Sequence, residues 1–236
     1  MSHPDPRTLL DALRAHVERL ARAPREPRTR EHREAARYIR ARLEEVGLAV
    51  EERRSRSGDL PCANLITRPI PDRPDLPLLV VGAHYDTVPA TPGADDNASA
   101  VAALLEIARW IGPRRTPPVA PAARLVLAAY DLEEYGFIGS SLHAGELARS
   151  RAPLAGMIAL EMLGFTGDRQ EIPPVLRGRY PETGNFIGVV ANERSRDLAS
   201  VVEAALRGVP GLPVESLAVP GAGEAIPETG ANRVPW

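Results

Sequence analysis

Three short apolar runs in this 236-residue chain each lead into histidine or acidic side chains. Residues 76–81 precede His84 and Asp86, residues 125–130 precede Glu133 and Glu134, and residues 156–160 precede Glu161. In an open α/β sheet the carboxyl ends of neighbouring strands meet at one edge, where a ligand can bind. Imidazole and carboxylate groups suit zinc or another divalent first-row ion in a hydrolytic site. The pattern therefore predicts one metal site at the ends of three strands.

A fourth acidic stretch, residues 93–100, allows two interpretations. Asp96 or Asn97 could be the N-cap of the helix that follows, a common role for these residue types. Alternatively, the Asp96 carboxylate could bridge two metal ions about 3.5–4 Å apart, an arrangement that clamps a carbonyl and activates water. Because His84 and Asp86 precede this stretch and Glu133 and Glu134 follow it, we retain Asp96 as a candidate ligand.

The adjacent carboxylates of Glu133 and Glu134 are predicted to have two different roles. One can hold a metal while the other accepts a proton from water and passes it to the leaving amine. Asp86 lies two residues after His84, where its carboxylate could accept the second imidazole N–H and fix the tautomer. The other Glu-Glu pairs, at residues 44–45 and 51–52, do not lie at the end of a predicted buried strand and are interpreted as surface charge.

The elements that must position these side chains follow from the hydrophobic periodicity. We expect helices near 6–20, 29–46, 97–110, 140–149 and 195–206, and strands near 48–53, 63–67, 76–81, 125–130, 157–161, 186–191 and 214–219. The alternation of strands and helices after residue 76 predicts parallel pairing with right-handed crossovers. We expect a turn at 55–59, a proline-rich linker at 69–77, a helix-breaking segment at 113–121 and a surface loop at 166–183.

Composition narrows the class of protein. The net charge of −2 and pI near 6.2 provide no basic surface, so we expect neither nucleic acid nor membrane as a partner. Cys62 is the only cysteine, which rules out an intrachain disulfide. With no signal-peptide pattern or span of about 20 apolar residues, the sequence predicts a cytoplasmic protein. All 29 basic residues are arginine, which we attribute to composition bias without a function.

Other reactive side chains receive structural interpretations. His3, His16 and His32 belong to the N-terminal helical region, and His143 is expected to be a surface or structural histidine on a helix. The chain contains no Gly-x-Ser-x-Gly sequence, which gives little support to serine hydrolase chemistry.

Four sequence blocks together resemble the co-catalytic di-zinc aminopeptidase family, which includes bacterial leucine aminopeptidases, glutamate carboxypeptidase, glutaminyl cyclases and the transferrin receptor. The blocks are Gly82-Ala83-His84-Tyr85-Asp86-Thr87-Val88, Pro92-Gly93-Ala94-Asp95-Asp96-Asn97-Ala98-Ser99, Glu133-Glu134-Tyr135-Gly136-Phe137-Ile138-Gly139-Ser140 and Leu160-Glu161-Met162. They occur in the family's order and spacing. Weaker similarity extends from about residue 29 to residue 195.

The resemblance implies a fold and a set of roles. The fold would be α/β, a three-layer α-β-α sandwich with a mixed, mostly parallel central sheet, forming one domain over 1–236 with N-terminal helices at 6–46 and a catalytic core at 48–236. His84, Asp96 and Glu161 would hold one zinc, and Asp96 and Glu134 the second. Glu133 would be the general base and Asp86 would orient His84, and the peptide bond after Asp96 would be cis. The implied function is a zinc-dependent aminopeptidase that removes N-terminal residues from a peptide or aminoacyl substrate.

Two departures from the family pattern matter. Glu161 stands where many relatives carry aspartate, a mild change because either carboxylate can bind a metal. In the family, a histidine near the C-terminus completes the second site, and this sequence has no histidine after His143. The alternative is therefore an inactive or truncated member, lacking its C-terminal elements, that acts as a binding module. A mono-zinc glutaminyl cyclase would need the same histidine, and an aminoacylase would need an inserted domain for which there is no room.

Overall fold

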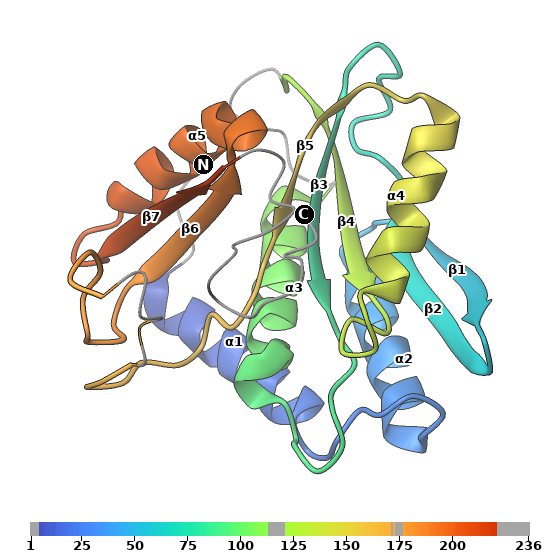
Figure 1. The fold of residues 1–236 in the computed structure, drawn as a ribbon. Coiled ribbons are helices and arrows are strands. Elements are labelled where there is room, and N and C mark those ends of the chain that lie inside the picture. The colour runs from blue at the N-terminus through green and yellow to red at the C-terminus, as the bar shows by residue number, and fades with distance from the viewer. Residues whose placement is uncertain (1–4, 113–120, 171, 173–176, 221–236) are drawn as a thin grey trace. The chain divides into compact units, whose positions relative to one another are not determined.

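The computed structural model describes residues 5–112, 121–170, 172 and 177–220 (Figure 1). The chain divides into two compact units, residues 1–164 and 165–236, and each is described by itself. A single domain over 1–236 stays a prediction. All of the candidate site residues belong to the first unit.

The first unit is built on a five-stranded sheet with the strand order β1-β2-β4-β3-β5. Its strands are β1 (Val50–Ser57), β2 (Leu60–Thr67), β3 (Leu78–His84), β4 (Arg124–Tyr130) and β5 (Leu154–Ala159). β3 pairs in parallel with both β4 and β5, whereas β1–β2 and β2–β4 are antiparallel. The sheet is therefore mixed, and the predicted parallel pairing of the apolar strands is confirmed.

The hairpin of β1 and β2 is longer than the sequence predicts. Residues 55–57, expected in a turn, continue β1, and the reversal needs only Gly58 and Asp59. Gly58 has a φ of 55°, the left-handed conformation that two-residue hairpin turns require and that glycine adopts without strain. The polar strand ends are stable because one face of an antiparallel pair can be exposed to water.

Helices cover both faces of this sheet. On one face lie α1 (Pro6–Leu20), α2 (Arg30–Glu45) and α3 (Ala100–Ile111), and on the other lies α4 (Ile138–Ser150) (Figure 1). Asp5 and Thr29 cap α1 and α2 through side-chain oxygens that accept from Thr8 and His32 backbone N–H groups. The three-layer α/β/α architecture of the first unit is confirmed.

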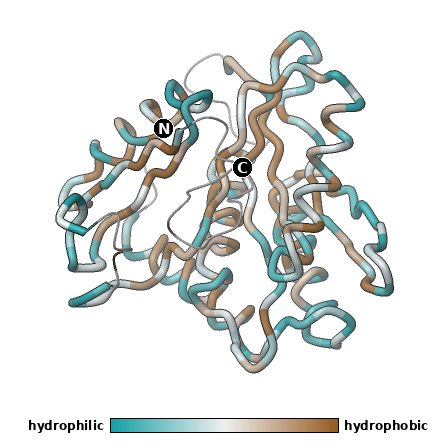
Figure 2. Tube along the Cα trace, in the orientation of Figure 1, coloured by the Kyte–Doolittle hydropathy of each residue, from teal (hydrophilic) through white to brown (hydrophobic). Residues whose placement is uncertain are grey.

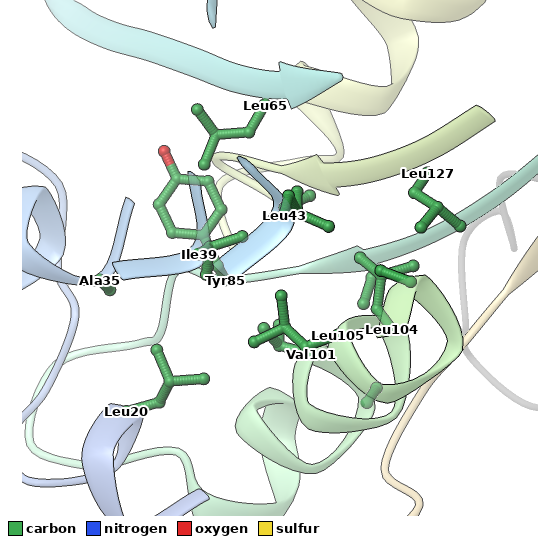
Figure 3. Close-up of a cluster of buried hydrophobic side chains, with 14 of the residues drawn as sticks. Leu20, Ala35, Ile39, Leu43, Leu65, Tyr85, Val101, Leu104, Leu105 and Leu127 are labelled. Atoms are coloured by element: carbon green, nitrogen blue, oxygen red, sulfur yellow. The ribbon is translucent and has the colours of Figure 1, made fainter. Parts of the chain in front are cut away.

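The main core lies between the sheet and the first helical layer (Figure 3). Ile39, Leu43, Val101 and Leu104 are fully buried in one cluster that also contains Leu127 of β4. Burying one such side chain contributes about 1.5–3 kcal/mol relative to exposure. Figure 2 shows the central strands as the most hydrophobic part of the trace, in contrast to the hydrophilic hairpin. β3 and β4, two of the strands that lead to the candidate site, are buried along most of their length.

Two predicted element boundaries are wrong near the candidate site. The helix expected from residue 97, α3, begins only at Ala100, and the short element before it, η1 (Ala94–Ser99), is interrupted by a kink. Asp96 and Asn97 have non-helical backbone angles, because the chain bends sharply there. β5 ends at Ala159, so Glu161 lies two residues beyond the strand.

The second unit contains a two-stranded parallel sheet of β6 (Ile187–Asn192) and β7 (Val214–Val219). A short 3-10 turn, η3 (Glu193–Ser195), and α5 (Arg196–Arg207) connect the strands, which confirms the predicted strand-helix-strand order. The segments 113–120 and 221–236, and part of the expected loop at 166–183, lie outside the described residues. No helix in the described ranges is long and apolar enough to cross a membrane.

Candidate metal centre

Three neighbouring parallel strands bring the predicted site residues to one edge of the first unit's sheet. His84 is the last residue of β3, the central strand of the three. Glu133 and Glu134 follow β4 on one side, and Glu161 follows β5 on the other. The sheet topology therefore gathers side chains that are up to 77 residues apart in sequence, from His84 to Glu161.

The imidazole of His84 is at the centre of the group. Its Nε2 lies 3.1 Å from Asp96 Oδ1, 3.5 Å from Glu161 Oε1 and 3.8 Å from Glu133 Oε2. His84, Asp96 and Glu134 each offer one ligand atom, and these three atoms lie within 4.8 Å of one another. All four predicted metal ligands and the predicted base thus lie around the His84 imidazole.

Asp86 is fully buried beside this group. Its Oδ1 lies 3.5 Å from His84 Nδ1 and accepts a hydrogen bond of 3.0 Å from the Glu133 backbone N–H. Its Oδ2 accepts a second hydrogen bond, of 3.1 Å, from the Glu134 backbone N–H. Asp86 therefore contacts both the imidazole and the backbone that carries the two glutamates.

The acidic side chains perturb one another strongly. Burial opposes protonation of His84, but Asp86, Asp96 and Glu161 raise the pKa of its imidazole to about 12. Burial raises the pKa of Glu133 to about 7, and the nearby charge of Glu134 adds to the effect. The His84 imidazole, in turn, holds the pKa of Asp96 below its usual value. The carboxylates around His84 Nε2 therefore favour a positive charge at this position.

The residues present fit a divalent metal ion. Among the described residues, Oδ1 of Asp96 is buried and has no hydrogen-bond partner. Buried polar atoms without partners are uncommon and call for an explanation. The donor set of one imidazole and several carboxylates, without thiolate, matches catalytic zinc sites. A cation shared by Asp96 and His84 would satisfy the Asp96 oxygen.

The segment 94–99 does not serve as a helix cap. Gly93 precedes η1 without a side-chain cap, and α3 also begins without one, so the capping interpretation of Asp96 or Asn97 is wrong. Instead, the Asn97 side-chain amide donates to Glu161 Oε2 at 2.9 Å and to the Leu160 carbonyl at 3.0 Å. The Asp96–Asn97 peptide bond is cis, as the family resemblance implies.

Asp95, Asn97 and Ser99 fix the segment after β5. They accept hydrogen bonds from the backbone N–H groups of Gly164, Met162 and Leu163, at distances of 2.8, 3.2 and 2.9 Å. The position of Glu161 is therefore set by η1 as well as by its own strand. The sequence predicted none of these contacts with the segment after β5, and Asn97 was interpreted only as a possible helix cap.

Two further groups behind the centre were missed. His32, assigned no function from sequence, is buried and places Nε2 2.7 Å from Asp131 Oδ1, directly beyond β4. Arg25 is 1% exposed and binds backbone carbonyls near His84 and Asp96. No local sequence signal distinguishes Arg25 from the other arginines. His143 is a buried structural histidine, with Nδ1 2.9 Å from the Tyr130 hydroxyl, in agreement with the structural interpretation.

The sequence profile of Peptidase family M28 matches residues 64–210, which contain every candidate site residue. The chain belongs to this family. The match to an M28 peptidase profile agrees with the resemblance drawn from the four sequence blocks.

Curated relatives of this M28 chain include aminopeptidases. It is 38% identical over 164 residues to the uncharacterized protein YfbL of Escherichia coli, a match covering 62% of this chain and 48% of YfbL. It is 33% identical over 93 residues to the aminopeptidase YwaD of Bacillus subtilis, covering 39% of this chain and 19% of YwaD. The matched region spans about half of YfbL and less of YwaD.

Solved structures share the fold of the M28 chain. A glutaminyl cyclase from Porphyromonas gingivalis matches with a TM-score of 0.66 and 22% identity, covering 89% of this chain and 75% of that one. A Zn-dependent exopeptidase from Parabacteroides distasonis matches with a TM-score of 0.64 and 22% identity, covering 89% and 77%. These similarities show the α/β fold of zinc exopeptidases and glutaminyl cyclases.

Proposed function

We propose that this chain is a zinc-dependent aminopeptidase-type hydrolase that removes N-terminal residues from peptides. The observation that carries the proposal is the position of His84 Nε2, within 3.5 Å of carboxylate oxygens of both Asp96 and Glu161. Membership of family M28 and the aminopeptidases among its relatives support the proposal. A cytoplasmic location, and the absence of nucleic-acid and membrane partners, remain predictions.

The site residues fall into two sets, the proposed zinc ligands and the groups that act beside them. His84, Asp96 and Glu161 would hold one zinc, and Asp96 and Glu134 a second. Zinc in such a site polarises a carbonyl and makes water more acidic. Asp86 lies where it can accept the Nδ1–H of His84, which leaves Nε2 facing the carboxylates.

Glu133 is the proposed general base. Its Oε2 lies 3.8 Å from His84 Nε2, so the carboxylate is beside the proposed ligands. A pKa raised by burial to about 7 favours a group that can both take and release a proton near neutral pH. Glu133 would accept a proton from the attacking water and return it to the departing amine.

Replacement of Glu133 by glutamine tests this role. We expect E133Q to bind as much zinc as the wild type and to lose about 10²- to 10⁴-fold in kcat on aminoacyl-nitroanilides. E45Q is a matched control, because Glu45 belongs to a Glu-Glu pair at the end of α2, where it forms an ion pair with Arg42. Full activity in zinc-loaded E133Q would overturn the assignment. The same nitroanilides acetylated on the amine should not be cleaved if the enzyme requires a free N-terminus.

A binding module without activity is the second candidate. The sequence has no histidine after His143, so the proposed second zinc would have only Asp96 and Glu134 as ligands in this chain. Zinc content measured after stripping and reloading, together with turnover on the nitroanilides, separates the candidates. About two zinc ions with turnover support the enzyme, whereas zinc-loaded protein without turnover supports the binding module.

A further inference from the structure

Arg25 is a buried cation in the segment between α1 and α2. Its exposed fraction is 1%, and it lies upstream of residues 64–210, the part of the chain matched by the family profile. Arginine is almost never fully buried unless its charge is paired or hydrogen-bonded. Specific partners must therefore hold this guanidinium group.

The partners are backbone carbonyls at both ends of one segment. Arg25 Nε donates to the Tyr85 carbonyl at 2.8 Å, and Nη2 donates to the Gly93 carbonyl at 3.0 Å. Nη1 donates to the carbonyls of Pro92, at 2.6 Å, and Leu20, at 3.0 Å. One planar group thus joins the end of α1 to both ends of the segment 85–93.

The Arg25 backbone contacts Thr87, near the start of the same segment. Its N–H donates to Thr87 Oγ1 at 2.8 Å, and its carbonyl accepts from the Thr87 backbone N–H at 3.3 Å. Side chain and backbone together hold the segment at Tyr85 and Thr87, near its start, and at Pro92 and Gly93, at its end. Such a set of contacts defines a conformation more narrowly than a single hydrogen bond could.

The segment 85–93 connects two of the proposed zinc ligands. Tyr85 directly follows His84, and Gly93 lies three residues before Asp96. Gly93 has a φ of 58°, and a Cβ atom there would lie 2.9 Å from Arg25 Nη2. The segment therefore packs closely against the guanidinium.

The positive charge of Arg25 is favourable at this position, because the carboxylates of Asp86, Asp96 and Glu134 are near it. Burial lowers the pKa of the guanidinium to about 10, while Asp86, Asp96 and Glu134 oppose that decrease, so the group stays protonated at neutral pH. A fixed positive charge behind the carboxylates reduces their mutual repulsion. Arg25 can thereby help to keep acidic ligands together before a metal binds.

We propose that Arg25 is a positioning residue for the metal centre. Its guanidinium fixes the segment 85–93 so that His84 and Asp96 face each other in the metal-free chain. The inference rests on the proposed function for the identity of the metal, and it does not depend on turnover.

The test compares Arg25→Lys and Arg25→Met with the wild type in the metal-free chain. Amide hydrogen exchange is measured at 85–93, and Zn²⁺ affinity is measured by competition with a chromophoric chelator. Lysine keeps the charge but cannot make the fork of contacts to several carbonyls. R42M, which removes an arginine packed near Tyr38, controls for the loss of an arginine on the same layer. L43A, in the main core, controls for a general loss of stability.

We expect exchange at 85–93 to accelerate, and Zn²⁺ affinity to fall, by about tenfold or more in R25K, the lower end of the effect of groups that orient metal ligands. R42M and L43A should keep Zn²⁺ affinity within about threefold of the wild type. R25K with wild-type exchange and wild-type Zn²⁺ affinity would overturn the proposal. The proposal would also fail if L43A and R25K lost the same unfolding free energy and showed equal changes in exchange and affinity. If R25M does not fold, R25K decides. Wild-type protein that binds no zinc would refute the proposed function, and exchange at 85–93 would still decide the role of Arg25.

Discussion

Asp86 and Glu133 are 47 residues apart in sequence and are joined by a 3.0 Å hydrogen bond from the Glu133 backbone N–H to Asp86 Oδ1. The same carboxylate accepts from the Glu134 backbone N–H and lies beside His84 Nδ1. One buried side chain therefore relates the end of β3 to the loop after β4. The orientation of the imidazole and the position of the proposed base depend on each other through it.

Asp86→Asn should disturb both sides of this connection. The amide NH₂ of asparagine must face either His84 Nδ1 or one of the backbone N–H donors, so at least one favourable contact is lost. We expect Zn²⁺ affinity to fall by about 10- to 100-fold and the free energy of unfolding by about 1–3 kcal/mol. Chelator competition and urea denaturation measure the two effects. D75N, at an exposed carboxylate paired with Arg73, should change neither.

Asn97→Asp tests how Glu161 is oriented. The new carboxylate would face Glu161 Oε2 and the Leu160 carbonyl, in place of an amide that donates to both. We expect about tenfold weaker Zn²⁺ binding, a typical loss for a group that orients a ligand. S99A is the matched control, because Ser99 fixes Leu163 in the same segment without contacting Glu161. Equal losses in both variants would mean that the segment as a whole, and not the Glu161 contact, determines affinity.

Gly93→Ala should be much more damaging than Gly58→Ala. Both glycines have left-handed φ angles, of 58° and 55°. A Cβ at Gly93 would collide with the Asp96 carbonyl and the Thr87 side chain, whereas a Cβ at Gly58 meets nothing within 4 Å. We expect G58A to lose about 1 kcal/mol and G93A about 2 kcal/mol or more of unfolding free energy. Similar losses, measured by thermal or urea unfolding, would show that the backbone relieves the collision.

His143 should make the stability of the first unit depend on pH. Burial lowers the pKa of its imidazole to about 4, Arg53 contributes in the same direction, and Glu146 opposes. Tyr130, its hydrogen-bond partner, is the other titratable group that faces it. The unfolded chain binds this proton near pH 6.5, so stability is complete above that pH and declines between about pH 6.5 and 4 as pH falls.

The variant H143Q isolates this effect. Glutamine can still bond to the Tyr130 hydroxyl but does not titrate. We expect the wild type to lose about 1–2 kcal/mol more than H143Q between pH 7 and 5, measured by urea unfolding at each pH. Parallel stability curves for the two proteins would contradict the prediction.

The positions of the elements follow largely from sequence. Asp5 and Thr29 cap helices that begin within one residue of the predicted starts at residues 6 and 29. Apolar runs ending at His84 and before Glu133 form adjacent parallel strands. These features depend on local periodicity and capping, which the sequence alone determines. The metal-ligand types at the strand ends could therefore be proposed before any contact was known.

Tertiary structure decided how these side chains are held. Asn97 contacts Glu161 across 64 residues of sequence, and Arg25 contacts Gly93 across 68. The backbone at Asn97, where the predicted helix was expected to begin, is non-helical. Such contacts leave no periodic pattern, because each partner is one polar residue in an irregular segment. The chemistry of the site is thus encoded locally, whereas its geometry exists only once the strands and η1 have packed together.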